Sequence, residues 1–240
     1  MSNFFHLIIS EPLYNGFIVL MNILPFFDAG VIIIIFTIIV KLILLPLSIK
    51  ASKAQIEMKG TEKDLQVIKE KYKNNKEEQS RKTMEYYKEK GINPFASIFV
   101  LIIQLPILIG LYRVFIKSGL PQINTSLLYS FVGPPVAINM IFLGFINISE
   151  KSILLAVIAG ISTYFQIKLS SPATTDGVQQ SEIIKAMSLQ MKYFFPILMA
   201  FIAYTISSAI ALYLITSNIF AIGQEIYIKR KYHKTPPLIV

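Results

Sequence analysis

The sequence predicts an all-α membrane protein with five transmembrane helices, an N-terminal interfacial amphipathic helix and a cytoplasmic helical hairpin. Three observations support this prediction. Hydrophobic residues make up 54% of the 240 residues, and the mean hydropathy is +0.58. Several apolar runs are about 18 to 22 residues long, which is the length that a helix needs to cross ~30 Å of hydrocarbon. The 23 lysines and arginines gather in a few polar segments, which sets the orientation.

The first element, residues 1–28, is expected to be an amphipathic helix on the external face of the membrane. No basic residue precedes His6, although a secretory signal peptide would need one. A first spanning helix is the alternative, and the polar residues of this stretch argue against it. Pro25 is expected to end the helix. Its apolar and polar residues recur on opposite faces, as Leu13, Phe17, Leu20 and Leu24 against Glu11, Asn15 and Asn22.

The first span is expected over residues 29–49, and a charged segment, residues 50–93, follows it. This segment has 12 basic and 8 acidic residues and no long apolar run. The run Lys73-Asn74-Asn75-Lys76 interrupts its helical pattern, and Gly91 supplies a stop signal, so we interpret it as an antiparallel helical hairpin in water. A sparse apolar stripe would form either the seam of the hairpin or a docking face; it consists of Leu65, Ile68, Tyr72, Met84 and Tyr87.

Four further spans complete the chain. About 38 nearly continuous apolar residues precede the basic tail, which is enough for two helices, and Ser207-Ser208 is the natural place for a tight turn between them. The remaining elements are therefore a second span at 94–117, an external loop at 118–151, a third span at 152–169, a cytoplasmic loop at 170–191, a fourth span at 192–207, a fifth span at 209–228 and a basic cytoplasmic tail at 229–240.

Basic residues set the orientation of these spans. With five spans and an external N-terminus, 19 of the 23 lysines and arginines fall on one side, which the positive-inside rule makes cytoplasmic. A sixth span at 134–148 would move either the tail or the large basic loop to the other side, so the charges argue against it. Whether 134–148 dips into the membrane stays open.

One lysine lies within the first span. Lys41 is in the stretch FTIIVKLILLPLSIK, about 16 Å along the helix from Gly30 and near the centre of the bilayer. An ammonium group that faced lipid there would cost at least ~2.5–3.5 kcal/mol. We therefore expect Lys41, with Thr37 one turn earlier on the same face, to border a water-filled cavity. The alternative is a lysine that reaches the membrane boundary by helix tilt and local thinning.

Polar residues in the other spans are consistent with a hydrated groove inside the bundle. The alternative for each of them is an interhelical hydrogen bond. The residues expected to line the groove are Lys41, Thr37, Gln104, Gln166, Thr205, Ser217 and Asn218.

The composition argues against an enzyme. The chain has no cysteine and two histidines, and no expected span contains a histidine or an aspartate, so the parts of an intramembrane protease or a metal site are missing. No GxxxxGK[ST] phosphate loop is present, and no cofactor is expected. The alternative function is a small transporter or channel with a cationic intramembrane site, although five spans do not divide into two equal repeats.

Three stretches in combination show a family resemblance. They are KLILLPLSIK at 41–50, NPF together with QLPI between 93 and 107, and KYFFP together with LYLITSNIFAIGQ between 192 and 224. With these stretches the chain, from Glu11 to Lys231, resembles the YidC/Oxa/Alb family of membrane protein insertases. The resemblance implies five spans around a hydrophilic groove that opens to the cytoplasm and to lipid. It also implies a cation of the first span in that groove, which by position is Lys41.

The resemblance further implies an insertase or chaperone that accepts nascent membrane proteins in the groove and releases their helices laterally into the bilayer without ATP. Most family members carry arginine where this chain has Lys41, which keeps the charge but lacks the planar fork. The expected partners are nascent membrane proteins and the lipid bilayer, with the ribosome and the Sec translocon as further partners and no DNA. Lys229, Arg230 and Lys231 would contact the ribosome or lipid.

The expected location is the plasma membrane of a bacterium. The sequence contains neither a large outer domain nor a lipobox cysteine, and it does not begin with an Arg-rich transit segment.

Overall fold

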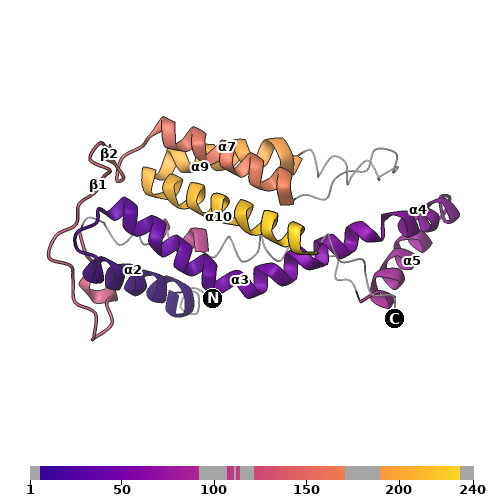
Figure 1. Cartoon of the computed structure of the whole chain (residues 1–240), viewed down its shortest axis with the longest axis horizontal. Helices are drawn as coiled ribbons and strands as arrows, with labels where there is room; N and C mark the ends of the chain where they lie inside the picture. The colour runs from indigo at the N-terminus through magenta and orange to yellow at the C-terminus, as the bar shows by residue number, and fades with distance from the viewer. Residues whose placement is uncertain (1–5, 92–106, 111, 114–121, 171–189, 233–240) are drawn as a thin grey trace.

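The structure is a computed structural model that describes residues 6–91, 107–110, 112–113, 122–170 and 190–232. Within these residues the chain is mainly helical, with a single pair of short strands (Figure 1). In chain order the elements are η1 (His6–Ser10), α2 (Glu11–Ile23), α3 (Ala29–Gly60), α4 (Glu62–Lys71), α5 (Lys76–Glu89), η3 (Thr125–Leu127), β1 (Ile141–Phe142), β2 (Ile146–Asn147), α7 (Ile153–Ser170), η4 (Gln190–Phe194), α9 (Phe195–Ile206) and α10 (Ser208–Tyr232).

Three described helices, α3, α7 and α10, are long and apolar enough to cross a membrane. Their apolar parts are Ala29–Ala54, Ile153–Ser170 and Ser208–Lys231, and a shorter apolar helix covers Gln190–Ile206. These four lie where the sequence places the first, third, fifth and fourth spans. Most of the second span, expected at 94–117, lies outside the described residues.

Helix α10 lies at the centre of the bundle, between α3 on one side and α7 with α9 on the other (Figure 1). Its first turns are buried on all sides, which a helix needs if it is surrounded by others. Helices α7 and α9 approach closely because Gly160 has no side chain. A Cβ at Gly160 would come within 2.9 Å of the Cβ of Ala200 and 3.2 Å of the carbonyl oxygen of Pro196.

The turn between α9 and α10 falls at Ser207, within the predicted Ser207-Ser208 pair. Ser207 is extended, with φ −172° and ψ 163°, which ends α9 in one residue. The first residue of α10 is held from outside the helix, because the amide and hydroxyl of Ser208 both donate to the carbonyl oxygen of Glu150, at 2.8 and 2.7 Å. This contact ties the turn to the segment that leads into α7.

The N-terminal helix α2 ends before Pro25, as predicted, but its polar face lies partly against the chain itself. Asn15 is only 2% exposed; its amide donates to the carbonyl oxygens of Glu11 and Leu127, and its side-chain oxygen accepts from the amide of Tyr129. Asn22 donates to the carbonyl oxygen of Gly133. The expected polar face therefore binds the backbone of the 122–152 segment, because backbone groups there need partners when α2 covers them.

The apolar face of α2 packs on α3 and on the short helical stretch at 107–110. Phe17 and Phe36 meet edge to face, with ring centroids 5.7 Å apart. A Cβ at Gly110 would lie 2.6 Å from Leu13, so glycine allows this close approach. Helix α2 is therefore an integral layer of the bundle at one end of α3.

Helix α3 runs without a break to Gly60, well beyond the expected end of the first span at residue 49. Residues 50–60 are rich in alanine, lysine, glutamine and glutamate, which favour a helix whether or not they are buried. The sequence placed these residues in the hairpin; in the structure they continue α3, and the two shorter helices begin only at Glu62.

Helices α4 and α5 follow α3 and lie side by side. Their break spans Tyr72–Asn75, next to the predicted interruption, and Gly91 has φ +66° just after α5. The hydroxyl of Tyr86 donates to a carboxylate oxygen of Asp64, and the amide of Gln79 donates to the carbonyl oxygen of Lys69. Leu65 is buried, but no residue of α5 is, so polar contacts dominate between the two helices.

Residues 134–148 contain no helix, so they do not form a sixth span. Strands β1 and β2 pair in antiparallel register, Ile141 with Asn147 and Phe142 with Ile146. Phe142 packs on the first turn of α3, where a Cβ at Gly30 would lie 2.4 Å from its ring.

Candidate functional site

The candidate site is a row of polar residues on the face of α3 that turns toward α10. Thr37, Lys41, Ser48 and Ser52 are spaced by four, seven and four residues, which places them on one face of a helix. Thr37 is 2% exposed, and its hydroxyl donates to the carbonyl oxygen of Ile33 at 2.7 Å. Lys41 is half-buried one turn later, in the most apolar of the candidate spans.

Two side-chain hydrogen bonds join this face of α3 to α10. The amide of Gln224 donates to the hydroxyl of Ser48 at 2.6 Å. One turn further along α3, the hydroxyl of Ser52 donates to a carboxylate oxygen of Glu225 at 3.0 Å. Beyond Lys41, toward α4, the contact between these two spans is therefore partly polar.

Glu225 and Lys229 form a clamp that joins α3, α7 and α10. Glu225 is 4% exposed, and the ammonium nitrogen of Lys229 lies 3.4 Å from its second carboxylate oxygen. Lys229 also donates to the carbonyl oxygen of Leu169, in the last turn of α7. The buried carboxylate thus has a cation and a hydroxyl as partners, which a buried charge requires.

Asn218 joins α10 to α7 nearer the middle of the bundle. Its amide donates to the hydroxyls of Ser162 and Thr163, at 3.0 and 2.8 Å. Both hydroxyls donate in turn to the carbonyl oxygen of Ala159. This network uses both amide hydrogens of Asn218.

The residues expected to line the groove are distributed over several places. Lys41 and Thr37 share the α3 face, and Ser217, which is 2% exposed, lies beside Asn218 on α10. Gln166 bonds to Ser170 of its own helix. Thr205 is exposed near the end of α9 and donates to the backbone of its own helix. Gln104 lies outside the described residues.

Three residues of the site were not anticipated in these roles. The sequence singled out Lys229 as a ribosome or lipid contact, but its side chain binds Glu225 and Leu169 inside the bundle. Ser48 and Ser52 were not identified at all. The spacing of Glu225 and Lys229, i and i+4, was a readable signal for the ion pair, whereas their partners on α3 and α7 depend on how the helices pack.

Arg230 and Lys231 are exposed after this clamp, on the last turns of α10. The ammonium of Lys231 lies 5.8 Å from the ring centroid of Tyr227. Helix α10 extends to Tyr232, so the expected basic tail begins as helix.

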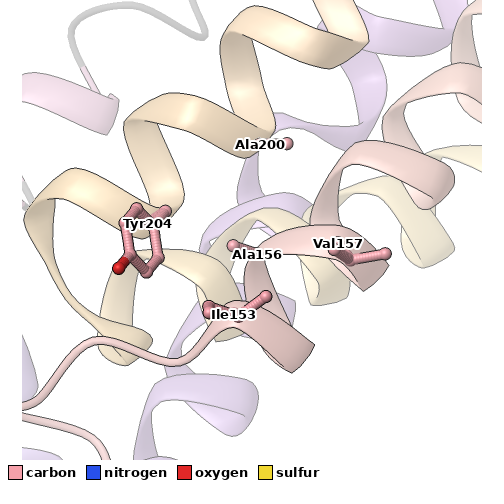
Figure 2. A pocket seen from close by; sticks show the side chains of 5 residues that line it. All are labelled: Ile153, Ala156, Val157, Ala200 and Tyr204. Carbon is pink, nitrogen blue, oxygen red and sulfur yellow. The ribbon is translucent and has the colours of Figure 1, made fainter.

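A shallow apolar hollow of about 370 Å³ lies elsewhere, between α7 and α9. Figure 2 shows its lining residues: Ile153, Ala156, Val157, Ala200 and Tyr204. The tyrosine hydroxyl is the only polar side-chain group in this lining, so the hollow lacks the convergent polar groups of a site for a small polar ligand.

Comparisons with known proteins identify the family. The family model described as 60Kd inner membrane protein, of the YidC/Oxa1 family, matches residues 20–235. The chain belongs to this family. "Membrane protein insertase YidC" of Fusobacterium nucleatum subsp. nucleatum is 35% identical over 202 residues, which are 84% of this chain and 86% of that protein. The protein of that name from Clostridium tetani is 34% identical over 211 residues, 88% of this chain and 86% of that protein.

The chain also matches part of a longer family member. "Membrane protein insertase YidC" of Francisella tularensis subsp. novicida is 29% identical over 206 residues, which are 86% of this chain but 33% of that protein. The YidC relatives and the apolar helices together make this chain a multi-pass protein of the bacterial inner membrane.

Proposed function

We propose that this chain is a membrane protein insertase and chaperone, which accepts nascent membrane proteins in a hydrophilic groove and releases their helices laterally into the bilayer. The observation that carries the proposal is Lys41, half-buried in an apolar span and on the same helix face as the polar contacts with α10. Membership of the YidC/Oxa1 family supports it.

The energetic problem of insertion is to move polar flanks of a substrate across hydrocarbon. A groove in one leaflet shortens the dry path. Lys41 would attract an acidic or polar tail of the substrate, in a medium where charges are less screened than in water. The substrate helix then partitions into lipid and gains ~0.8 kcal/mol per buried methylene, so lateral release needs no ATP. The membrane potential adds ~2.3 kcal/mol per charge and 100 mV for an acidic tail.

The polar contacts between α3 and α10 would lie at the cytoplasmic entrance of this groove. Water or a polar stretch of substrate can replace the hydrogen bonds of Ser48 and Ser52 at little net free energy, because both sides stay hydrogen-bonded. If the contact between α3 and α10 were apolar over the same area, parting the two helices would expose apolar surface to water, which costs free energy. We therefore propose that this edge can part while the rest of the bundle stays packed.

The proposed orientation places α4, α5 and the end of α10 in the cytoplasm and residues 122–152 outside. Helices α4 and α5 would then form the cytoplasmic hairpin that meets the emerging chain. Arg230 and Lys231 would contact anionic lipid or the ribosome, at ~1 kcal/mol per basic residue near anionic lipid. Assistance by the Sec translocon belongs to the same proposal.

Insertion by the purified full-length chain in vesicles tests the proposal. The substrate is a labelled single-span protein with an acidic N-terminal tail, and protease protection of the tail measures insertion. We expect Lys41→Ala to lower the insertion rate roughly tenfold, equivalent to about 1.4 kcal/mol, and Lys41→Arg to retain most of the rate. Lys50→Ala, which removes an exposed lysine of the same helix, is the control.

Equal insertion rates for Lys41→Ala and the unmodified chain would show that attraction of the substrate tail by Lys41 is not part of the mechanism. Ion flux through substrate-free vesicles, with no insertion of the labelled protein, would instead favour a transporter or channel.

A further inference from the structure

Two turns lie side by side at the end of the bundle where α3 begins. The first joins α2 to α3, and the second joins β1 to β2. Asp28 connects them, because one carboxylate oxygen accepts from the amide of Val31 at 2.9 Å and the other accepts from the amide of Leu143 at 3.3 Å. The amide of Ala29 donates to the carbonyl oxygen of Asn139 at 2.8 Å. The second turn is thereby fixed to the start of α3.

These turns expose four large apolar side chains, which we call the apolar double turn. The exposed fractions are 96% for Phe26, 50% for Phe27, 60% for Leu143 and 72% for Phe145. Each such side chain would gain ~1.5–3 kcal/mol on full burial, and this free energy is not gained while the side chain is in water. Contiguous exposed apolar groups indicate a contact with lipid or another protein.

The backbone at Leu143 gives an independent argument. Leu143 has φ +52°, the left-handed region that glycine and asparagine occupy readily and that costs other residues about 1–2 kcal/mol. A strained residue is retained when the surroundings or a function require it. Since Leu143 is mostly exposed, the fold itself gains little from its side chain. A contact of this side chain outside the chain would offset part of the backbone cost.

The position of the double turn indicates which partner this is. Residues 122–152 cross the end of the bundle where all three candidate spans begin, at Ala29, Ile153 and Ser208. Leu143 and Phe145 therefore lie beside the ends of these candidate spans, where hydrocarbon would end if the spans cross a bilayer. Large apolar and aromatic side chains at that level enter the boundary between headgroups and acyl chains.

We propose that the apolar double turn inserts into the headgroup–acyl boundary of the bilayer and anchors the start of α3 at a fixed depth. Lys41 follows Ala29 by twelve residues, so the anchor would hold the ammonium-bearing turn about 18 Å deeper. The anchor rests on the membrane location of the chain. It does not depend on the insertase proposal, because it can be measured without any substrate.

Site-specific fluorescence tests the anchor in the full-length chain, in vesicles of phosphatidylethanolamine and phosphatidylglycerol. The chain has no cysteine, so a single introduced cysteine carries the only label. An environment-sensitive dye is placed at Phe145→Cys, at Phe26→Cys, or at the exposed polar control Ser126→Cys of the same loop. Shallow nitroxide-labelled lipids should quench the first two labels at least about twofold more than the control, and iodide should quench them less. Equal quenching at all three positions would overturn the proposal.

The leucine is tested by a second pair of variants, read through the label at position 145. Leu143→Gly suits the backbone at φ +52° and removes the apolar side chain, whereas Leu143→Met keeps an apolar side chain. We expect Leu143→Gly to lower lipid quenching while the unfolding midpoint in detergent does not fall, and Leu143→Met to leave quenching unchanged. Unchanged quenching in Leu143→Gly would overturn the anchoring role of Leu143.

Discussion

Glu225 shows how a single buried charge can organise the end of the bundle. It is nearly inaccessible, and two residues from two helices bind its carboxylate oxygens. While α3 and α10 stay in contact, water is excluded from these partners, so the clamp should behave as a unit. The charges alone do not make it a strong source of stability, since desolvation offsets much of the attraction.

We expect Lys229→Met to destabilise the protein by about 3 kcal/mol, because it leaves the buried carboxylate of Glu225 without its cation. This is the low end of the usual range, since Lys229 keeps some contact with water. Glu225→Gln should cost less, because the amide can still bond to Ser52. The double variant should be more stable than Lys229→Met alone. Unfolding midpoints in detergent measure the stability of all three variants. If the stability loss of the double variant equalled the sum of the two single losses, the clamp would be contradicted.

At the scale of elements, the contact of α7 with α9 depends on one glycine. The Cβ of an alanine at position 160 would meet Ala200 at 2.9 Å and backbone at 3.2 Å. We expect Gly160→Ala to destabilise the protein by about 1–3 kcal/mol through overpacking. Gly223→Ala is the matched control, since nothing lies within 4 Å of its Cβ and alanine favours a helix by ~0.5–1 kcal/mol.

Rescue separates packing from other effects of this substitution. Ala200→Gly removes the closer of the two contacts, so Gly160→Ala with Ala200→Gly should recover part of the lost stability in the same detergent assay. No recovery would show that the close approach at Ala200 is not the cause.

Helices α4 and α5 should separate at high pH. Burial, followed by the hydrogen bond to Asp64, raises the pKa of Tyr86 to about 12 from an ordinary value of 10.0. The folded state then holds the phenol proton more tightly than the unfolded state. The resulting stabilisation is complete below pH 10 and is lost as the pH rises toward 12.

Nitroxide labels at Lys63→Cys and Lys88→Cys, both exposed, can follow this contact by their distance distribution. We expect the distribution to broaden between pH 10 and 12. In Tyr86→Phe the hydrogen bond is absent at every pH, so this variant should change less over the same range. Equal broadening in both proteins would show that deprotonation of lysines, and not of Tyr86, causes the change.

The helical elements were largely predictable from the sequence, and their mutual contacts were not. The apolar runs predicted α7 and α10, and Ser207-Ser208 predicted the break between α9 and α10, because a polar pair between apolar runs marks a turn. The apolar run ends near residue 49, whereas helix propensity stays high over residues 50–60, so the apolar pattern alone does not predict the extension of α3 to Gly60.

The candidate site was predictable where it depends on a single helix. Lys41 and Thr37 share a face by spacing alone, and the structure places them so. The partners of Asn15, Ser52 and Lys229 lie over a hundred residues away or on other helices, and no local pattern specifies them. A polar side chain in apolar surroundings predicts that a hydrogen bond will form, but it does not specify the partner residue.

The charges of the chain predict the orientation of the whole molecule, which can be measured directly. Helices α4 and α5 carry many charges of both signs, and the basic excess of the chain lies beside them and in the last turn of α10. Exposed charged helices and the 122–152 segment lie at opposite ends of α3 (Figure 1). The positive-inside rule therefore predicts α4 and α5 in the cytoplasm and residues 122–152 outside.

Single cysteines at Ser126, in the 122–152 segment, and at Ser80, on α5, report this orientation, since both positions are exposed. A membrane-impermeant maleimide applied to intact spheroplasts should label Ser126→Cys and spare Ser80→Cys. After lysis it should label both, which controls for reactivity. Labelling of Ser80→Cys alone in intact spheroplasts would show that the molecule has the opposite orientation in the membrane. The contacts of Ser48 and Ser52 with α10 would then lie at the external end of the bundle, and the proposed groove could not receive a nascent chain from the ribosome.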